Sequence, residues 1–264
     1  MTAKNKKTDR HTPSTEETLQ ATRLVAYAEH NARFSKEPLV KAANKRSDSQ
    51  RSAMDYLLIS TDAWQQGKHE TALRLAYTGL ALAPADKRIL SCLEVRLGTV
   101  FADLAGEERT FELATECFTA AKSMDKKFSL PLIFEGDMYF DQGDYEEAEE
   151  CYKKAVTLDP TNPSSFNSMG YLFLEQDRLE EAELEFCKAE KLEPDLPIVH
   201  LHLATVLQRQ NKLDEAVDEM KIAIRMYPDN ASYCRQLGDL YTEMGKKKDA
   251  SKYYEKAVTL LEKN

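Results

Sequence analysis

Histidines and clustered glutamates are the residues of this chain whose types could support metal binding or acid–base chemistry. His200 and His202 are one residue apart and therefore point to opposite sides of a helix, whereas a helical metal-binding pair needs i, i+4 spacing. The acidic run at residues 145–150 has the composition of a solvated helix face. The chain also lacks a glycine-rich phosphate loop and a GxSxG motif. We therefore predict no catalytic residue, no metal site, no cofactor and no enzymatic activity.

The cysteines and the apolar segments indicate a compartment. The chain has five cysteines, an odd number, and no two of them have CxxC spacing. Reduced thiols of a cytoplasmic protein are the plain interpretation. No N-terminal apolar stretch resembles a signal peptide, and no stretch approaches the roughly 18 apolar residues of a membrane helix. We expect a cytoplasmic protein without a membrane span.

The charge of the chain is unevenly distributed and narrows the choice of partner. The formal net charge is -9. Residues 1–52 contain 11 Lys/Arg and 6 Asp/Glu, whereas residues 53–264 contain 25 Lys/Arg and 39 Asp/Glu. Nucleic-acid affinity comes largely from neutralising phosphates, which an acidic body cannot do. We therefore expect no nucleic-acid partner.

A 34-residue repeat organises most of the chain. Pro160, Pro194 and Pro228 are each 34 residues apart. Small residues recur with the same period in three sets: Ala148, Ala182, Ala216 and Ala250; Ala155, Ala189, Ala223 and Ala257; and Gly136, Gly170, Ala204 and Gly238. Small residues at fixed phases of such a period indicate stacked helical hairpins that bury their apolar faces against one another.

Each block of the repeat predicts two helices, at about positions 1–14 and 17–31. Between them, position 15 holds residues that accept the left-handed backbone of a helix C-terminus: Gly143, Asp177, Asn211 and Gly245. Position 24 is large and apolar or aromatic: Tyr152, Phe186, Met220 and Tyr254. With these positions, the blocks resemble the tetratricopeptide repeat (TPR) family. The resemblance implies an all-α, right-handed α-solenoid of about six helix-turn-helix repeats with an N-terminal helical extension.

We divide the chain into a disordered basic tail at 1–13, a helical extension at 14–52 and a TPR solenoid at 53–264. The predicted repeats are 53–86, 87–128, 129–162, 163–196, 197–230 and 231–264. The second has eight extra residues, which we expect to lengthen each of its helices by about one turn. The extension is predicted to contain helices at about 14–34 and 39–45. It could cap the first hairpin, mediate dimerisation or occupy a groove of the solenoid.

The TPR resemblance also implies a concave face, lined by the first helix of each repeat. Carried onto this chain, it implies a protein-binding groove formed by Leu57, Trp64, Leu130, Ile133, Asp137, Phe140, Asn167, Tyr171, Leu174, Ile198, Leu201, Thr205, Arg235 and Asp239. The same phase in the second repeat gives Arg88, Ser91, Val95, Gly98 and Thr99. An exposed apolar stripe from Leu130 to Leu201 would bind a peptide or an amphipathic helix of a protein partner. Alternatively, curvature of the repeats or the N-terminal segment buries this stripe.

The groove positions exclude one known use of this fold. TPR co-chaperones of the heat-shock chaperones Hsp70 and Hsp90 hold a C-terminal carboxylate with lysines, asparagines and an arginine. The corresponding positions here do not supply the cations. We therefore expect no carboxylate-clamp binding of Hsp70 or Hsp90.

These features together predict a non-enzymatic scaffold or adaptor that binds one protein partner. The apolar groove is similar in character to that of bacterial secretion chaperones built from TPRs, which suggests a chaperone-like role. Two alternatives stay open. The chain could be a self-assembling structural component, a homo-oligomer built by stacking of repeats, or it could be a regulatory subunit of an enzyme.

Overall fold

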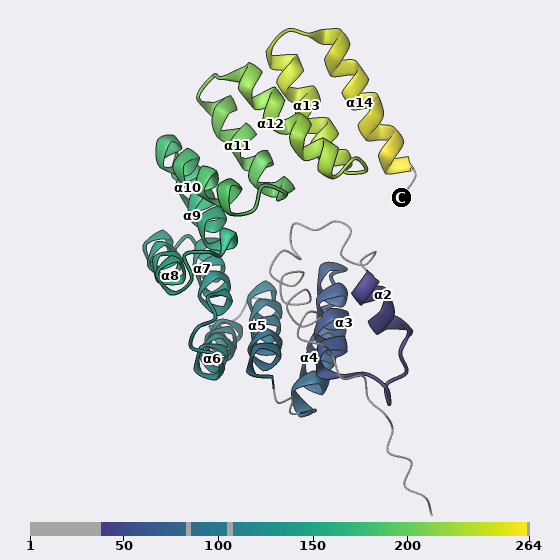
Figure 1. The fold of residues 1–264 in the computed structure, drawn as a ribbon, viewed down its shortest axis with the longest axis vertical. Helices are drawn as coiled ribbons and strands as arrows, with labels where there is room; N and C mark the ends of the chain where they lie inside the picture. Colours follow the sequence, from purple (N-terminus) through teal and green to yellow (C-terminus); the bar gives the residue numbers. More distant parts are fainter. Residues whose placement is uncertain (1–37, 83–85, 105–107, 263–264) are drawn as a thin grey trace, which may run out of the picture. The chain divides into compact units, whose positions relative to one another are not determined.

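The computed structural model describes residues 38–82, 86–104 and 108–262 (Figure 1). These residues form thirteen helices and contain no strand, so the predicted all-α fold is confirmed. The tail at 1–13 and the helix expected at 14–34 lie outside the described residues. In the described part, no helix is both long and apolar enough to cross a membrane. The chain divides into two compact units, Met1–Gly143 and Asp144–Asn264, which are treated separately below.

Both units consist of consecutive helices that pack against their neighbours in the chain. The first unit contains α2 (Pro38–Lys45), α3 (Ala53–Gln65), α4 (His69–Ala81), α5 (Lys87–Asp103), α6 (Glu108–Met124) and α7 (Leu130–Gln142). The second contains α8 (Tyr145–Leu158), α9 (Pro163–Glu175), α10 (Leu179–Leu192), α11 (Pro197–Arg209), α12 (Leu213–Met226), α13 (Ala231–Glu243) and α14 (Lys247–Glu262). The first helices of successive repeats also touch one another, α3 with α5, α5 with α7, and α9 with α11.

The turns inside the hairpins form where the sequence predicts them. Asp177 and Asn211 have left-handed backbones, with φ of 57° and 61°, as do Gly143 and Gly245 at the same repeat position. The left-handed residue reverses the chain and lets the next amide close the end of the helix. The amide of Arg178, for example, donates to the carbonyl of Phe173 at 2.8 Å. A second helix therefore begins within two residues of the reversal.

Small residues allow the two helices of a hairpin to approach closely. A Cβ atom added to Gly170 would lie 2.8 Å from the ring of Phe186, and one added to Gly238 would lie 2.6 Å from the ring of Tyr254. Ala182 on α10 is fully buried beside this contact region. The small residue at position 8 of a repeat, glycine or alanine, and the large side chain at position 24 are thus complementary, which explains why small and large residues recur at these positions every 34 residues.

The second repeat accommodates its eight extra residues by lengthening both helices. α5 and α6 have 17 residues each, compared with 13 in α9 and 14 in α10, in agreement with the expected extra turn. A Cβ atom on Gly98 would lie 2.6 Å from the ring of Phe118, the contact that Gly170 makes with Phe186. Gly98 therefore faces α6, and its expected place in the groove is wrong. The repeat position of Gly98 was assigned wrongly because four of the extra residues precede it, so that it corresponds to Gly170.

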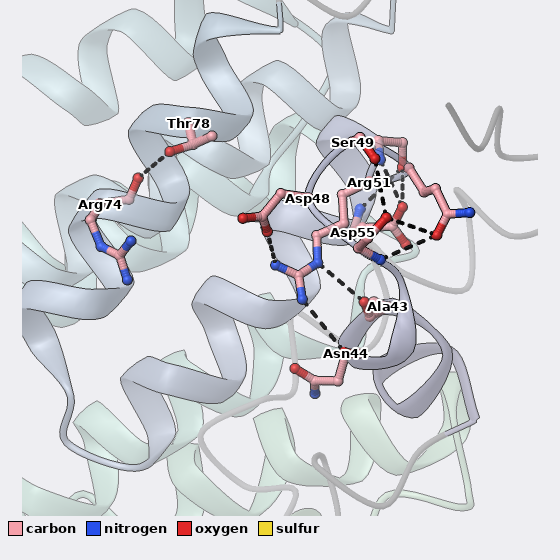
Figure 2. Close-up of polar contacts among 11 residues, drawn as sticks. Ala43, Asn44, Asp48, Ser49, Arg51, Asp55, Arg74 and Thr78 are labelled. Atoms are coloured by element: carbon pink, nitrogen blue, oxygen red, sulfur yellow. Dashed lines mark hydrogen bonds and ion pairs between the residues drawn. The ribbon is translucent and has the colours of Figure 1, made fainter. Parts of the chain in front are cut away.

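The short helix α2 is held against the first hairpin by polar contacts (Figure 2). Arg51 donates to the carbonyls of Ala43 and Asn44, at 3.4 and 3.5 Å, near the end of α2. Carbonyls in the last turn have no partner within their own helix, and the Ala43 carbonyl also accepts from the Arg46 amide at 3.2 Å. Asp55 is fully buried, accepts from the backbone amide of Ser52 at 2.8 Å and forms an ion pair with Arg46. This network joins the end of α2 to the start of α3.

Replacing Asp55 with alanine is expected to lower the free energy of unfolding by about 2 kcal/mol, since the capping box of α3 and the partner of Arg46 are lost together. Urea unfolding followed by circular dichroism measures this change. Asp48→Ala is the matched control, because Asp48 is exposed and its pair with Arg51 should contribute less than about 0.5 kcal/mol. Equal stability of the two variants would contradict the assigned role of Asp55.

Candidate protein-binding face

Six of the predicted groove residues lie in the first unit, where the face is largely closed. Leu57, Trp64, Leu130 and Ile133 are buried, while Asp137 and Phe140 are partly exposed. The expectation that Leu130 and Ile133 lie on an exposed stripe is therefore wrong. The helix that carries both, α7, packs against α5 and α6, and these two side chains belong to the buried core.

Trp64 lies in a polar cluster that the sequence did not predict. Its indole nitrogen donates to the carboxylate of Asp103 on α5. The guanidinium of Arg96, also on α5, lies 4.0 Å from the centre of the indole ring, which is a cation–π contact. Arg96 is fully buried and donates to the hydroxyls of Thr61 at 3.2 Å and Thr99 at 2.9 Å. These contacts join α3 to α5 and make Trp64 part of the packing between repeats.

In the second unit, the first helices of successive repeats are joined by regularly spaced polar contacts. Each contact links residues 35 positions apart: Asn167 with His202, the Leu174 carbonyl with Arg209, and Gln208 with Glu243. A separation of one repeat plus one residue therefore brings residues of successive first helices, α9 with α11 and α11 with α13, next to each other. This spacing is the signal by which lateral neighbours on this face can be found in the sequence.

Tyr171 is the exposed aromatic residue of this face, with 37% of its surface accessible. Its ring stacks on that of His202, with centroids 5.1 Å apart and an interplanar angle of 29°. His202 is buried, and its Nδ1 lies 3.0 Å from the side-chain oxygen of Asn167. Because an amide oxygen only accepts, Nδ1 is the donor. Phe186 lies 5.0 Å from the same imidazole and completes the support beneath Tyr171.

The other predicted residues of the second unit are exposed to different degrees. Ile198, Leu201 and Thr205 are partly exposed on α11, and Arg235 and Asp239 are exposed on α13. Leu174 is buried, which contradicts its expected place on the open stripe. Its backbone carbonyl accepts a hydrogen bond of 2.8 Å from the guanidinium of Arg209 on α11. The structure therefore brings Asn167 and Tyr171 together through His202, a residue missing from the predicted set.

The comparison with protein families gives a direct assignment. A model of the C-terminal domain of cilia and flagella-associated protein 70, a TPR domain, matches residues 14–264. The chain belongs to this family. The resemblance to TPR proteins is therefore confirmed over almost its whole length. A search of curated proteins found no match.

Solved structures agree on the fold of this family member. The Cut9–Hcn1 hetero-tetramer of the APC/C has a TM-score of 0.67 at 16% identity, over 94% of this chain and 46% of the matched chain. PilF of Pseudomonas aeruginosa has a TM-score of 0.57 at 22% sequence identity, and the match covers 76% of this chain and 88% of PilF. MamA has a TM-score of 0.52 at 23% sequence identity, and the match covers 61% of this chain and 95% of MamA. At these identities the likeness establishes the TPR architecture alone.

Proposed function

We propose that this chain is a non-catalytic protein-interaction module of a cilia- and flagella-associated protein. It binds a segment of a ciliary or flagellar partner on the face formed by α9, α11 and α13. The observation that carries the proposal is the exposed ring of Tyr171, held by His202. The family description supports the cilium or flagellum as the place where the partner is found.

The physical case rests on the rigidity of Tyr171. An aromatic ring that is already stacked and supported loses little conformational freedom when a partner covers it, and such residues dominate binding energies. Ile198 and Leu201 add apolar surface on α11, while Arg235 and Asp239 on α13 offer charges of both signs. The face therefore suits a peptide or amphipathic helix with an apolar anchor residue and polar groups on one side of it.

The alternatives receive less support. The family match favours a ciliary partner over the cargo of a secretion chaperone. A TPR structure similar to this chain was solved as a hetero-tetramer, which is consistent with binding a different protein. Self-assembly by stacking predicts a mass that grows with concentration, and light scattering distinguishes it from a one-to-one adaptor. Regulation of an enzyme predicts that the bound partner carries the catalytic residues.

Tyr171→Arg is expected to weaken binding of the ciliary partner about thirtyfold, the effect of losing a binding hot spot of about 2 kcal/mol. Capture from extracts of isolated cilia identifies the partner, and titration with the purified partner then measures the dissociation constant. Tyr77→Arg is the matched control, because Tyr77 on α4 is 52% exposed and lies outside the proposed face.

Retention of the same partner by both variants with equal affinity would rule out this face as the binding site. Leu201→Asp is a poorer probe than Tyr171→Arg. Leu201 packs against the buried cluster of α12, α13 and α14, so its replacement is also expected to reduce stability.

A further inference from the structure

Three side chains that are far apart in the sequence converge in the second unit, outside the proposed binding face. They are Glu190 on α10, His200 on α11 and Glu219 on α12, and one potential ligand atom from each lies within 4.8 Å of the others. The Nδ1 atom of His200 is 2.7 Å from a carboxylate oxygen of Glu219. His200 is buried, and both glutamates are partly exposed.

The orientation of His200 is set from outside this cluster. Its Nε2 lies 3.1 Å from the carbonyl oxygen of Pro194, and a carbonyl only accepts, so Nε2 carries a hydrogen. In the neutral ring, Nδ1 would then direct a lone pair at Glu219, so the 2.7 Å contact needs a cation, which is either a proton on Nδ1 or a metal ion that displaces this proton. A histidine that donates one ring nitrogen to a backbone carbonyl and points the other at the ion is the usual arrangement of a metal ligand.

The electrostatics of the cluster also favour positive charge. A neutral imidazole and two carboxylates would together neutralise a divalent ion. One nitrogen with two carboxylate oxygens suits Zn²⁺, whereas Mg²⁺ and Ca²⁺ prefer oxygen ligands alone.

The dimensions permit such an ion after a small adjustment. Zn²⁺ binds nitrogen and carboxylate oxygen at about 2.0–2.2 Å in tetrahedral geometry, so two of its ligand atoms lie about 3.3–3.6 Å apart. The His200–Glu219 pair, at 2.7 Å, must therefore open slightly, and separations of up to 4.8 Å must shorten, by rotation of the two partly exposed glutamate side chains. The exposed side of the cluster leaves room for entry of the ion and for a water molecule as fourth ligand.

We propose that Glu190, His200 and Glu219 form a binding site for a divalent transition-metal ion of the zinc type. The ion ties the second helix of one repeat, α10, to both helices of the next, α11 and α12. It therefore stabilises the junction between two repeats, and one of the joined helices, α11, also carries His202 and Leu201. This site does not depend on the proposed partner binding.

The test uses the whole chain after removal of metal with a chelator. One equivalent of Co²⁺, a spectroscopic substitute for Zn²⁺, is expected to bind with visible absorption bands, and Zn²⁺ is expected to raise the unfolding temperature by mass action. His200→Gln and Glu219→Gln should each weaken Co²⁺ binding at least about a hundredfold, beyond the about 10–100-fold cost of losing an outer-shell group. Because Glu219 is partly exposed, Glu219→Gln is expected to fold normally, so it tests the site even if the buried His200→Gln substitution disturbs the fold.

Two matched controls separate this site from the other histidines and glutamates. His69→Gln on α4 and Glu180→Gln, exposed on α10, should bind Co²⁺ like the wild type. The proposal is overturned if the wild type binds no Co²⁺, or if both His200→Gln and Glu219→Gln bind it unchanged. In either case a proton alone occupies the space between His200 and Glu219.

Discussion

Replacing Phe186 with alanine is expected to lower the free energy of unfolding by about 3–5 kcal/mol, the usual cost of deleting a buried phenylalanine ring. The ring is fully buried on α10, directly below the α-carbon of Gly170 on α9. Ala182 and Ala189, four residues before it and three after it on α10, are fully buried and too small to fill the cavity that would remain. Urea unfolding followed by circular dichroism measures the change.

Leu184→Ala provides the matched control for Phe186→Ala. Leu184 lies on the same helix and is 56% exposed, so its truncation should change the free energy of unfolding by less than about 0.5 kcal/mol. A similar small effect of both substitutions would show that Phe186 does not fill the hairpin core. Phe186→Ala should also weaken partner binding, because the ring supports His202 beneath Tyr171.

Replacing Gly170 with valine is expected to destabilise the protein by about 1–3 kcal/mol through overpacking. A Cβ atom at this position would already lie 2.8 Å from the ring of Phe186, and the two methyl groups of valine would come closer still. A shift of the ring would disturb its contact with His202, whose ring centre is 5.0 Å away. Urea unfolding again provides the measurement.

The physical origin of this effect can be tested by a double-mutant cycle. In a Phe186→Leu background the ring is gone, so Gly170→Val should cost clearly less than it does in the wild type. Equal costs in the two backgrounds would show that the loss comes from the lower helix propensity of valine or another contact. The same reasoning applies to Gly98 with Phe118 and to Gly238 with Tyr254.

Local features of the fold follow from residue type and spacing. Asp177 and Asn211 end their helices because both types tolerate a left-handed backbone, and Pro194 follows the end of α10 because proline disfavours a helical residue before it. The helix predicted at 39–45 is observed as α2, from Pro38 to Lys45. Gly98 was misplaced because an insertion inside a helix shifts the phase of every residue after it.

The exposure of the predicted binding residues does not follow from residue type and spacing. Leu130, Ile133 and Leu174 are buried, whereas Ile198 and Leu201 remain partly exposed, although all five are aliphatic residues of first helices. The difference depends on which neighbouring helix covers each side chain. Residue type alone carries no information about that neighbour.

The sequence by itself determined that this chain is a TPR protein, because helix ends, turns and the pairing of small with aromatic residues depend on contacts within one 34-residue hairpin. Only the tertiary structure placed His202 beneath Tyr171, 31 positions earlier, and gathered Glu190 and Glu219 around His200. These side chains belong to different helices, and Glu190 lies in the preceding repeat. Their separations in space are set by the packing of one hairpin on the next, and none of these pairs has the 35-residue spacing that relates neighbouring first helices.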